Sequence, residues 1–113
     1  MIAQLPLTEA DWSRRVLDCA KLFHWRTAHF RAAQTVKGWR TPVQGDGNGW
    51  PDLVLLRPPR LIVAELKSDT GRVSEEQSNW IAQLAEVPGL EVHIWRPSDW
   101  ETVYTTLAKE SKA

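Results

Sequence analysis

Two apolar runs on either side of a double proline constrain the fold of this chain more than any other feature. The runs lie within residues 52–67 and are separated by Pro58 and Pro59. Apolar runs of this length, bounded by turn residues, are typical of neighbouring strands, so we predict a β-hairpin with strands over about 52–57 and 60–67. Because both strands are apolar at consecutive positions, we also expect helices on both faces of the sheet.

The register of this hairpin brings two carboxylates together. A turn centred on the two prolines places Asp52 directly opposite Glu65. Opposed residues on antiparallel strands have Cβ atoms about 4.5–5.5 Å apart, and Lys67 points to the same face as Glu65. Two carboxylates this close repel each other unless a cation lies between them, and their oxygens suit Mg²⁺ or Mn²⁺. We therefore predict a divalent-metal site here, with the backbone carbonyl of Leu66 as a further candidate ligand.

The residues around the two acids are compatible with chemistry on a phosphate. Lys67 is placed to orient an attacking water or to stabilise negative charge that develops on phosphate oxygens. Pro51 lacks an N–H and suits the first residue of a strand, whereas Gly49 permits a sharp turn or the close approach of a substrate. The alternative is an ordinary surface ion pair, because an Asp…Glu-x-Lys pattern is short and common.

The rest of the chain alternates helical and extended patterns. Ser74 and Gln77 match a capping box at the start of a helix whose Trp80, Ile81 and Leu84 we expect to point inward. Thr8 is the expected N-cap of an earlier helix. We predict helices over about 8–22, 74–86 and 98–109 and additional strands over about 25–30 and 90–95, in the order αβββαβα.

Residues 31–49 show neither the helical nor the strand periodicity of apolar residues. They contain many Gly, Gln, Arg and Asn residues. We predict a mobile loop, and a loop of this length in a compact domain is usually functional or disordered. We expect its basic side chains to contact nucleic acid phosphates, with one aromatic ring available for stacking. The residues concerned are Arg31, Lys37, Trp39 and Arg40.

Composition and charge set the wider limits. We expect a single domain over residues 1–113, without a transmembrane helix or secretory signal, in the cytoplasm. The single Cys19 excludes an internal disulfide and a cysteine-rich zinc site. A formal net charge of +0 argues against indiscriminate binding of polyanions. However, residues 13–60 hold nine Arg and Lys against three acids, which either marks a nucleic-acid face or is merely uneven surface charge.

Three motifs carry a resemblance to a known family. They are Gly49-Trp50-Pro51-Asp52, Glu65-Leu66-Lys67 and Gln77. In this order they resemble the PD-(D/E)XK nuclease superfamily, and within it the VRR-NUC (virus-type replication–repair nuclease) family, over most of the chain. The resemblance implies an α/β, restriction-endonuclease-like αβββαβ core, with a mixed central sheet flanked by helices. It also implies metal-dependent cleavage of DNA phosphodiester bonds.

The resemblance implies roles for individual residues as well. Asp52 and Glu65 would be metal ligands, Lys67 the catalytic lysine, and Gln77 the motif glutamine near the site. Glu9 would match the acid that often completes the metal shell. Two of these residues also have structural explanations, because Gln77 fits a capping box and an acid such as Glu9 is favoured near a helix N-terminus.

Substrate and partners are expectations that also derive from the resemblance. Stand-alone proteins of similar fold act as dimers on junctions, so we expect a homodimer that prefers Holliday junctions or flaps, in phage or bacterial replication and repair. Two alternatives remain, a non-catalytic DNA-binding or adaptor module and an enzyme directed at RNA or tRNA. The presence of Asp52, Glu65 and Lys67 argues against the adaptor. We expect His24, His29 and His93 to be structural or surface residues, and Arg72 is a candidate phosphate contact.

Overall fold

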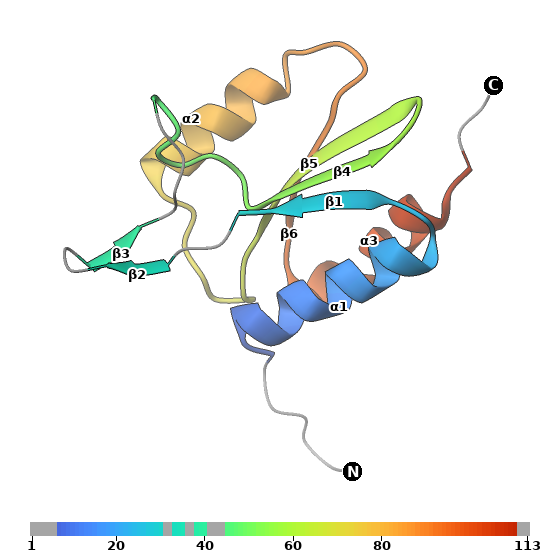
Figure 1. Ribbon diagram of the computed structural model, residues 1–113, viewed down its shortest axis with the longest axis horizontal. Coiled ribbons are helices and arrows are strands. Elements are labelled where there is room, and N and C mark those ends of the chain that lie inside the picture. Colours follow the sequence, from blue (N-terminus) through green and yellow to red (C-terminus); the bar gives the residue numbers. More distant parts are fainter. Residues whose placement is uncertain (1–6, 31–32, 36–37, 41–44, 111–113) are drawn as a thin grey trace.

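A four-stranded mixed sheet organises the structure (Figure 1). The computed structural model describes residues 7–30, 33–35, 38–40 and 45–110, with backbone only for 33–35 and 38–40. The helices are α1 (Glu9–Leu22), α2 (Glu75–Leu84), α3 (Trp100–Ala108) and a 3₁₀ turn η1 (Pro97–Asp99). The strands are β1 (Arg26–His29), β2 (Ala33–Thr35), β3 (Gly38–Arg40), β4 (Leu53–Arg57), β5 (Arg60–Leu66) and β6 (Glu91–Trp95).

The main sheet has the order β1-β4-β5-β6. β1 and β5 both pair antiparallel with β4, whereas β6 pairs parallel with β5. Leu53 is opposite Ala64 and Leu55 is opposite Ile62, which is the predicted hairpin register. Continued by one residue, this register places Asp52 opposite Glu65 at the open end of the hairpin.

The helix boundaries follow local capping signals. The Thr8 hydroxyl accepts a hydrogen bond from the Asp11 N–H at 3.1 Å, and α1 begins at the next residue, Glu9. Ser74 and Gln77 form the predicted capping box at the start of α2. That helix ends at Leu84, slightly before the predicted position. The predicted elements of the core are thus confirmed, with shifts of one or two residues at their ends.

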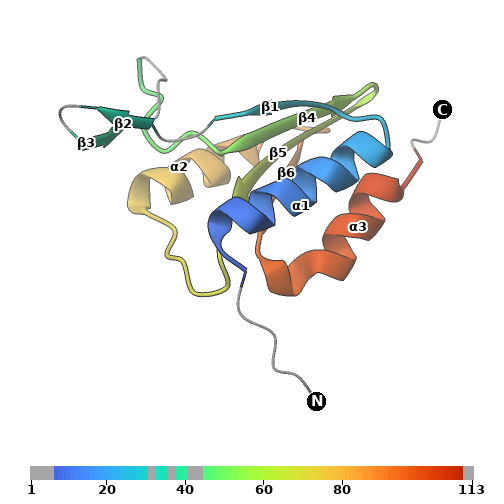
Figure 2. The same ribbon diagram turned by 60° about the horizontal axis from the view of Figure 1, so that its bottom comes forward.

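One face of the sheet carries the core. α1 and α3 pack side by side on this face (Figure 2). The Trp12 indole N–H donates to the Trp95 carbonyl and the Trp25 indole N–H to the Leu107 carbonyl, each at 2.9 Å. These bonds satisfy the polar atoms of rings that are otherwise apolar. The fully buried residues are Trp12, Val16, Ala20, Leu53, Leu55, Ile62, Ala64, Val103 and Leu107.

Helices flank both faces of the sheet, as expected from the apolar runs, but the second face is only partly covered. α2 lies on this face, but none of its residues is buried, and Trp80, Ile81 and Leu84 are only half-buried. Leu56 and Leu61, opposed on the two hairpin strands, remain 38% and 39% exposed. The helix therefore covers the open end of the hairpin and leaves its turn end bare.

The segment predicted as a mobile loop contains a small second sheet. β2 and β3 form a short antiparallel hairpin, so the prediction of a loop throughout 31–49 was wrong for these strands. Three of the basic and aromatic residues proposed to contact nucleic acid, Arg31, Lys37 and the Trp39 side chain, lie outside the described residues, as does the Arg40 side chain. Within the described ranges, no helix is both long and apolar enough to cross a membrane.

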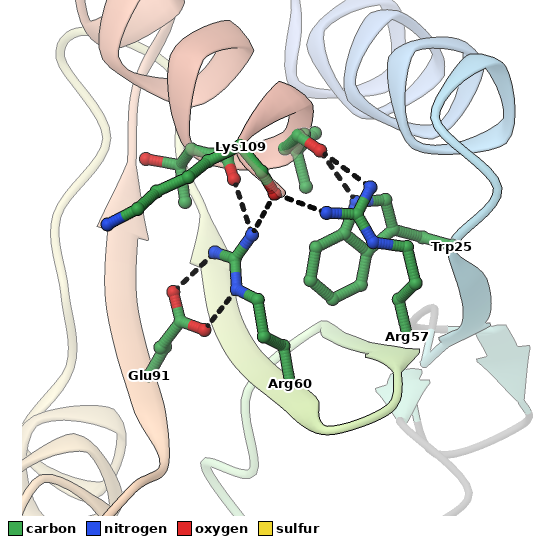
Figure 3. Close-up of polar contacts among 7 residues, drawn as sticks. Trp25, Arg57, Arg60, Glu91 and Lys109 are labelled. Carbon is green, nitrogen blue, oxygen red and sulfur yellow. Dashed lines mark hydrogen bonds and ion pairs between the residues drawn. The ribbon is translucent and has the colours of Figure 1, made fainter. Parts of the chain in front are cut away.

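The turn end of the hairpin holds two opposed arginines (Figure 3). Arg57 donates to the carbonyls of Phe23, Leu107 and Lys109. Arg60 binds both carboxylate oxygens of Glu91, at 2.8 and 2.6 Å, and also donates to the carbonyls at the end of α3. Both guanidinium groups lie over the Trp25 ring, 4.6 and 4.9 Å from its centroid.

These contacts explain why α3 ends without a basic residue in its last turn. The unpaired carbonyls of a helix C-terminus carry partial negative charge and are stabilised by cations. Arg57 and Arg60 supply that charge from the hairpin. Two of the nine basic residues that suggested a nucleic-acid face are therefore structural.

Candidate functional site

Asp52 and Glu65 meet at the open end of the hairpin in different environments. Asp52 is half-buried, and its Oδ2 accepts a hydrogen bond from the Leu66 N–H at 3.0 Å. Glu65 is 1% exposed, and its Oε1 accepts a hydrogen bond from the Gln77 side-chain amide at 2.9 Å. Its Oε2 is buried without a hydrogen-bond partner among the described residues. Buried polar atoms are rarely left in this state, so the atom is available to a ligand.

The burial of Glu65 distinguishes this pair from an ordinary surface ion pair, and it has an electrostatic consequence. Burial, and secondarily the charge of Asp52, raises the pKa of Glu65 to about 8, although the Lys67 ammonium acts in the opposite direction. Lys67 Nζ lies 3.9 Å from Glu65 Oε1, at the outer limit of an ion pair. Lys67 is therefore too distant to compensate the buried carboxyl fully. Strongly shifted pKa values of this origin are typical of functional sites.

The donor set at this end fits a hard divalent cation. It combines the free Glu65 oxygen, the Asp52 carboxylate and the Leu66 carbonyl at the end of β5, all oxygen ligands. Among the described residues, no three His, Cys, Asp or Glu side chains form a metal-binding group by themselves. An arrangement with two carboxylates suits Mg²⁺ or Mn²⁺, which commonly retain water or take phosphate oxygens as their remaining ligands.

An open cleft of about 430 Å³ leads away from this pair. Asp52 and Leu66 line one end of it, and Glu9, in the first turn of α1, lines it as well. The Glu9 carboxylate also approaches the turn after β5, since a Cβ built on Gly71 would lie 3.3 Å from its Oε1. The fold thus brings the predicted Glu9 to the cleft of Asp52, from the other end of the sequence.

Gln77 is both the capping-box partner of Ser74 and a neighbour of the candidate site, the two possibilities considered from the sequence. Its Oε1 accepts a hydrogen bond from the Ser74 N–H at 2.9 Å, while its Nε2 donates to Glu65. Gly49 fixes this arrangement from the other side. Its φ is +89°, and an added Cβ would lie 2.6 Å from the backbone carbon of Glu76. Only glycine lets the segment before Asp52 approach α2 so closely.

Three aromatic rings join the same segment to α2. Phe30 and Trp50 have ring centroids 6.4 Å apart, and Trp50 and Trp80 have centroids 5.0 Å apart, both edge to face. The Trp80 indole N–H donates to the Asn48 carbonyl at 2.9 Å, and the Phe30 N–H donates to the Asp52 carbonyl. Trp50 and Trp80 thus position the segment that carries Asp52.

The other wall of the cleft was not indicated by the motifs. It consists of one face of α1 and the end of β1, namely Ala10, Ser13, Arg14, Leu17, Asp18, His29 and Phe30. Helical spacing from Glu9 would have identified Ser13, but nothing local predicts that β1 approaches α1 here. His29 therefore lines the cleft. The other histidines lie elsewhere, since His24 is exposed after α1 and His93 stacks on Trp95 at 5.1 Å.

Comparison with known proteins agrees with this geometry. The family model of the VRR-NUC domain matches residues 3–97, a span that includes every residue of the candidate site. No curated protein and no solved structure gives a significant match. A VRR-NUC domain is a PD-(D/E)XK-type domain with a nuclease-type function, and nucleases of this kind generally use divalent metals. The match and the mixed sheet flanked by helices confirm the fold class expected from the motifs.

Proposed function

Because the chain belongs to the VRR-NUC family, we propose that it is a metal-dependent endonuclease that hydrolyses phosphodiester bonds in DNA. The observation that carries this proposal is the Glu65 carboxyl, buried opposite Asp52 with one oxygen lacking a partner. Burying such a group costs stability unless it is neutralised. A bound cation and a substrate phosphate would account for the buried carboxyl. A DNA-binding adaptor does not cleave and would not need such a group.

In this proposal Asp52, Glu65 and the Leu66 carbonyl would hold Mg²⁺ or Mn²⁺, and Glu9, in the first turn of α1, would be a further ligand. When bound, such an ion supplies Lewis acidity, which withdraws charge from phosphate oxygens and makes a nearby water more acidic. The Gln77 amide donates to Oε1 of Glu65 and so fixes one carboxylate oxygen while leaving Oε2 for the cation. Gln77 is therefore a positioning residue.

Lys67 acts on the reacting groups. It follows β5 directly, and its backbone N–H donates to the Trp95 carbonyl at 3.0 Å, which holds the start of its side chain in place. Its ammonium orients the attacking water or stabilises the negative charge that grows on the phosphate oxygens. Its side chain is only 14% exposed, which strengthens that interaction relative to one in bulk water.

The substrate in this proposal is branched DNA, such as a Holliday junction or a flap, in phage or bacterial replication and repair in the cytoplasm. A homodimer would present two such sites to one junction. The bare pair Leu56 and Leu61 supports association, because the sheet face that they form lacks a covering element among the described residues. Light scattering of the purified protein measures the assembly directly, and a monomer at micromolar concentration would contradict this part.

Cleavage assays test the catalytic proposal. Linear, nicked, flapped and four-way-junction DNA, and an RNA of matched sequence, are incubated with Mg²⁺, Mn²⁺ or EDTA. We expect cleavage only with metal, and its loss in Asp52→Ala and Lys67→Ala. Glu86→Gln, which changes an exposed acid of the turn after α2, is the matched control and should retain activity. Cleavage that survives EDTA would refute the metal mechanism, and binding without cleavage of any substrate would favour the adaptor.

A further inference from the structure

Arg14 differs from most arginines in the described part of the chain because its guanidinium has no protein partner. Four others are committed to carbonyls, a carboxylate or an aromatic ring, namely Arg15, Arg57, Arg60 and Arg96. Within the described ranges, Arg14 makes no hydrogen bond, ion pair or ring contact, a property it shares only with Arg26 and Arg72. Its five N–H donors are therefore available to a ligand.

The position of Arg14 distinguishes it from the other two. Arg14 lines the cleft that contains Asp52, whereas neither Arg26 nor Arg72 does. It follows Glu9 by five residues, about 1.4 turns of α1, and both residues line the cleft. α1 runs alongside β1 at this point (Figure 1), and His29 at the end of β1 forms part of the facing wall.

The charges of the cleft make Arg14 important for any anionic strand. Three carboxylates line it, on Glu9, Asp18 and Asp52, and Arg14 is the one Arg or Lys among the described lining residues. A nucleic acid brings one negative charge per nucleotide, so a strand that passes Asp52 meets repulsion along this wall. A guanidinium counteracts that repulsion, and its planar fork matches two oxygens of a phosphate.

We propose that Arg14, with the Ser13 hydroxyl as a second donor, binds a backbone phosphate next to the one that is cleaved. The cleft between α1 and the end of β1 is then the path of the substrate strand as it leaves the metal site. This inference rests on the proposed nuclease function for the position of the cleaved phosphate. The anion-binding property of Arg14 itself requires no catalysis and is tested separately.

The first experiment compares Arg14→Gln with Arg26→Gln. Arg26 is also exposed and unpartnered, but it lies on β1 three residues from His29, so its side chain faces away from the cleft. Affinity for a fluorescent DNA oligonucleotide is measured in EDTA over a range of salt concentrations. We expect Arg14→Gln to weaken binding about 10- to 100-fold and to reduce the salt slope by about 0.7–0.9, with Arg26→Gln close to wild type. Equal effects of the two variants would overturn the proposal.

The second experiment locates the phosphate. Single methylphosphonate linkages, which are uncharged, are placed in turn on either side of the cleavage position. At one position the modification should weaken binding by wild type but not by Arg14→Gln, because the variant has already lost that contact. With metal present, Arg14→Gln should raise KM more than it lowers kcat. Additive losses at every position would refute a direct contact.

These measurements separate the two proposals. A wild-type protein that binds DNA without cleaving it refutes the nuclease function, while the affinity and the salt slope of Arg14→Gln still decide the phosphate contact. A wild-type protein that cleaves, with no defect in Arg14→Gln, refutes only the phosphate contact. Absence of DNA binding by wild type refutes both. Circular dichroism of each variant verifies that it is folded.

Discussion

At each end of the β4–β5 hairpin, two side chains of like charge lie opposite each other. The two ends differ in whether these groups find hydrogen-bond partners within the protein. At the turn end, Arg57 and Arg60 face each other, and carbonyls and Glu91 satisfy their guanidinium groups. At the open end, Asp52 faces Glu65, and one buried oxygen of Glu65 has no partner among the described residues. The first cluster is complete within the fold, whereas the second is not.

This difference shows how a structural pair of charges is distinguished from a functional one. Charge and proximity alone do not separate them, because both ends bring like charges together. What separates them is whether each hydrogen-bond donor and acceptor has a partner within the protein. The turn end stabilises the docking of α3 onto the sheet, while the open end keeps a buried oxygen that is available to a ligand. The same criterion, together with its position in the cleft, singles out Arg14 among the described arginines.

The largest expected effect is at the open end. Glu65→Gln should reduce cleavage at least about 100-fold, because the amide is a poor ligand for a divalent cation. Without metal it should raise the melting temperature at pH 7 relative to wild type, because a pKa of about 8 means that folding must protonate the Glu65 carboxyl, a cost that the neutral amide does not carry. Wild-type protein should be stabilised by Mn²⁺ and the variant should not. A variant that cleaves normally would show that Glu65 is not needed for cleavage and that the open end is not the functional site.

The next largest effect is expected at the turn end, where a substitution should reduce stability but not cleavage. Arg60→Met should lower the free energy of unfolding by about 2–4 kcal/mol, because it leaves the Glu91 carboxylate and the Thr106 carbonyl without their arginine donor. Cleavage per folded molecule should not change. Chemical denaturation and the initial cleavage rate measure the two quantities. Arg60→Lys, which keeps the charge without the fork, should give an intermediate loss of stability.

Gly49 provides a third test, because it joins the open end to α2. Gly49→Ala places a side chain at a φ of +89° and against the backbone of Glu76. We expect a loss of about 1–3 kcal/mol in the free energy of unfolding, accompanied by lower activity as Gln77 moves relative to Glu65. Gly45→Ala is the matched control, since its φ is +70° but an added Cβ there meets no atom within 4 Å. Equal losses in cleavage would show that the contact with α2 is unimportant.

The smallest expected effect is a difference in how the free energy of unfolding depends on pH, measured in EDTA. The raised pKa of Glu65 means that its contribution to stability is full below its ordinary value of 4.5 and is lost as the pH rises through about 8. The pKa of Glu91 is lowered, chiefly by its hydrogen bonds to Arg60, so its contribution is present above pH 4.5 and is lost as the pH falls further. Glu65→Gln should remove a slope of at most about 1.4 kcal/mol per pH unit between about pH 4.5 and pH 8. Glu91→Gln should leave that slope unchanged.

The accuracy of the sequence predictions varies with the range of the interactions involved. The hairpin register, the capping box and the opposition of Asp52 and Glu65 depend on residues close in sequence, and the structure confirms them. The bare sheet face at Leu56 and the cleft wall depend on where α1 and α2 pack. Helix placement is a tertiary property that composition and periodicity do not specify. The same limit applies to Arg57 and Arg60, whose partners come from α3.

The Trp95 carbonyl has a consequence for how the protein loses its site. This oxygen accepts hydrogen bonds from the Trp12 indole at 2.9 Å and from the Lys67 backbone N–H at 3.0 Å, so both of its lone pairs are used. Because Trp12 is fully buried, the strand end that carries Lys67 cannot open without disturbing the core. Local opening should therefore cost nearly as much as global unfolding. The Lys67 amide should be among the slowest to exchange with deuterium, and heat should destroy the site and the fold in a single transition.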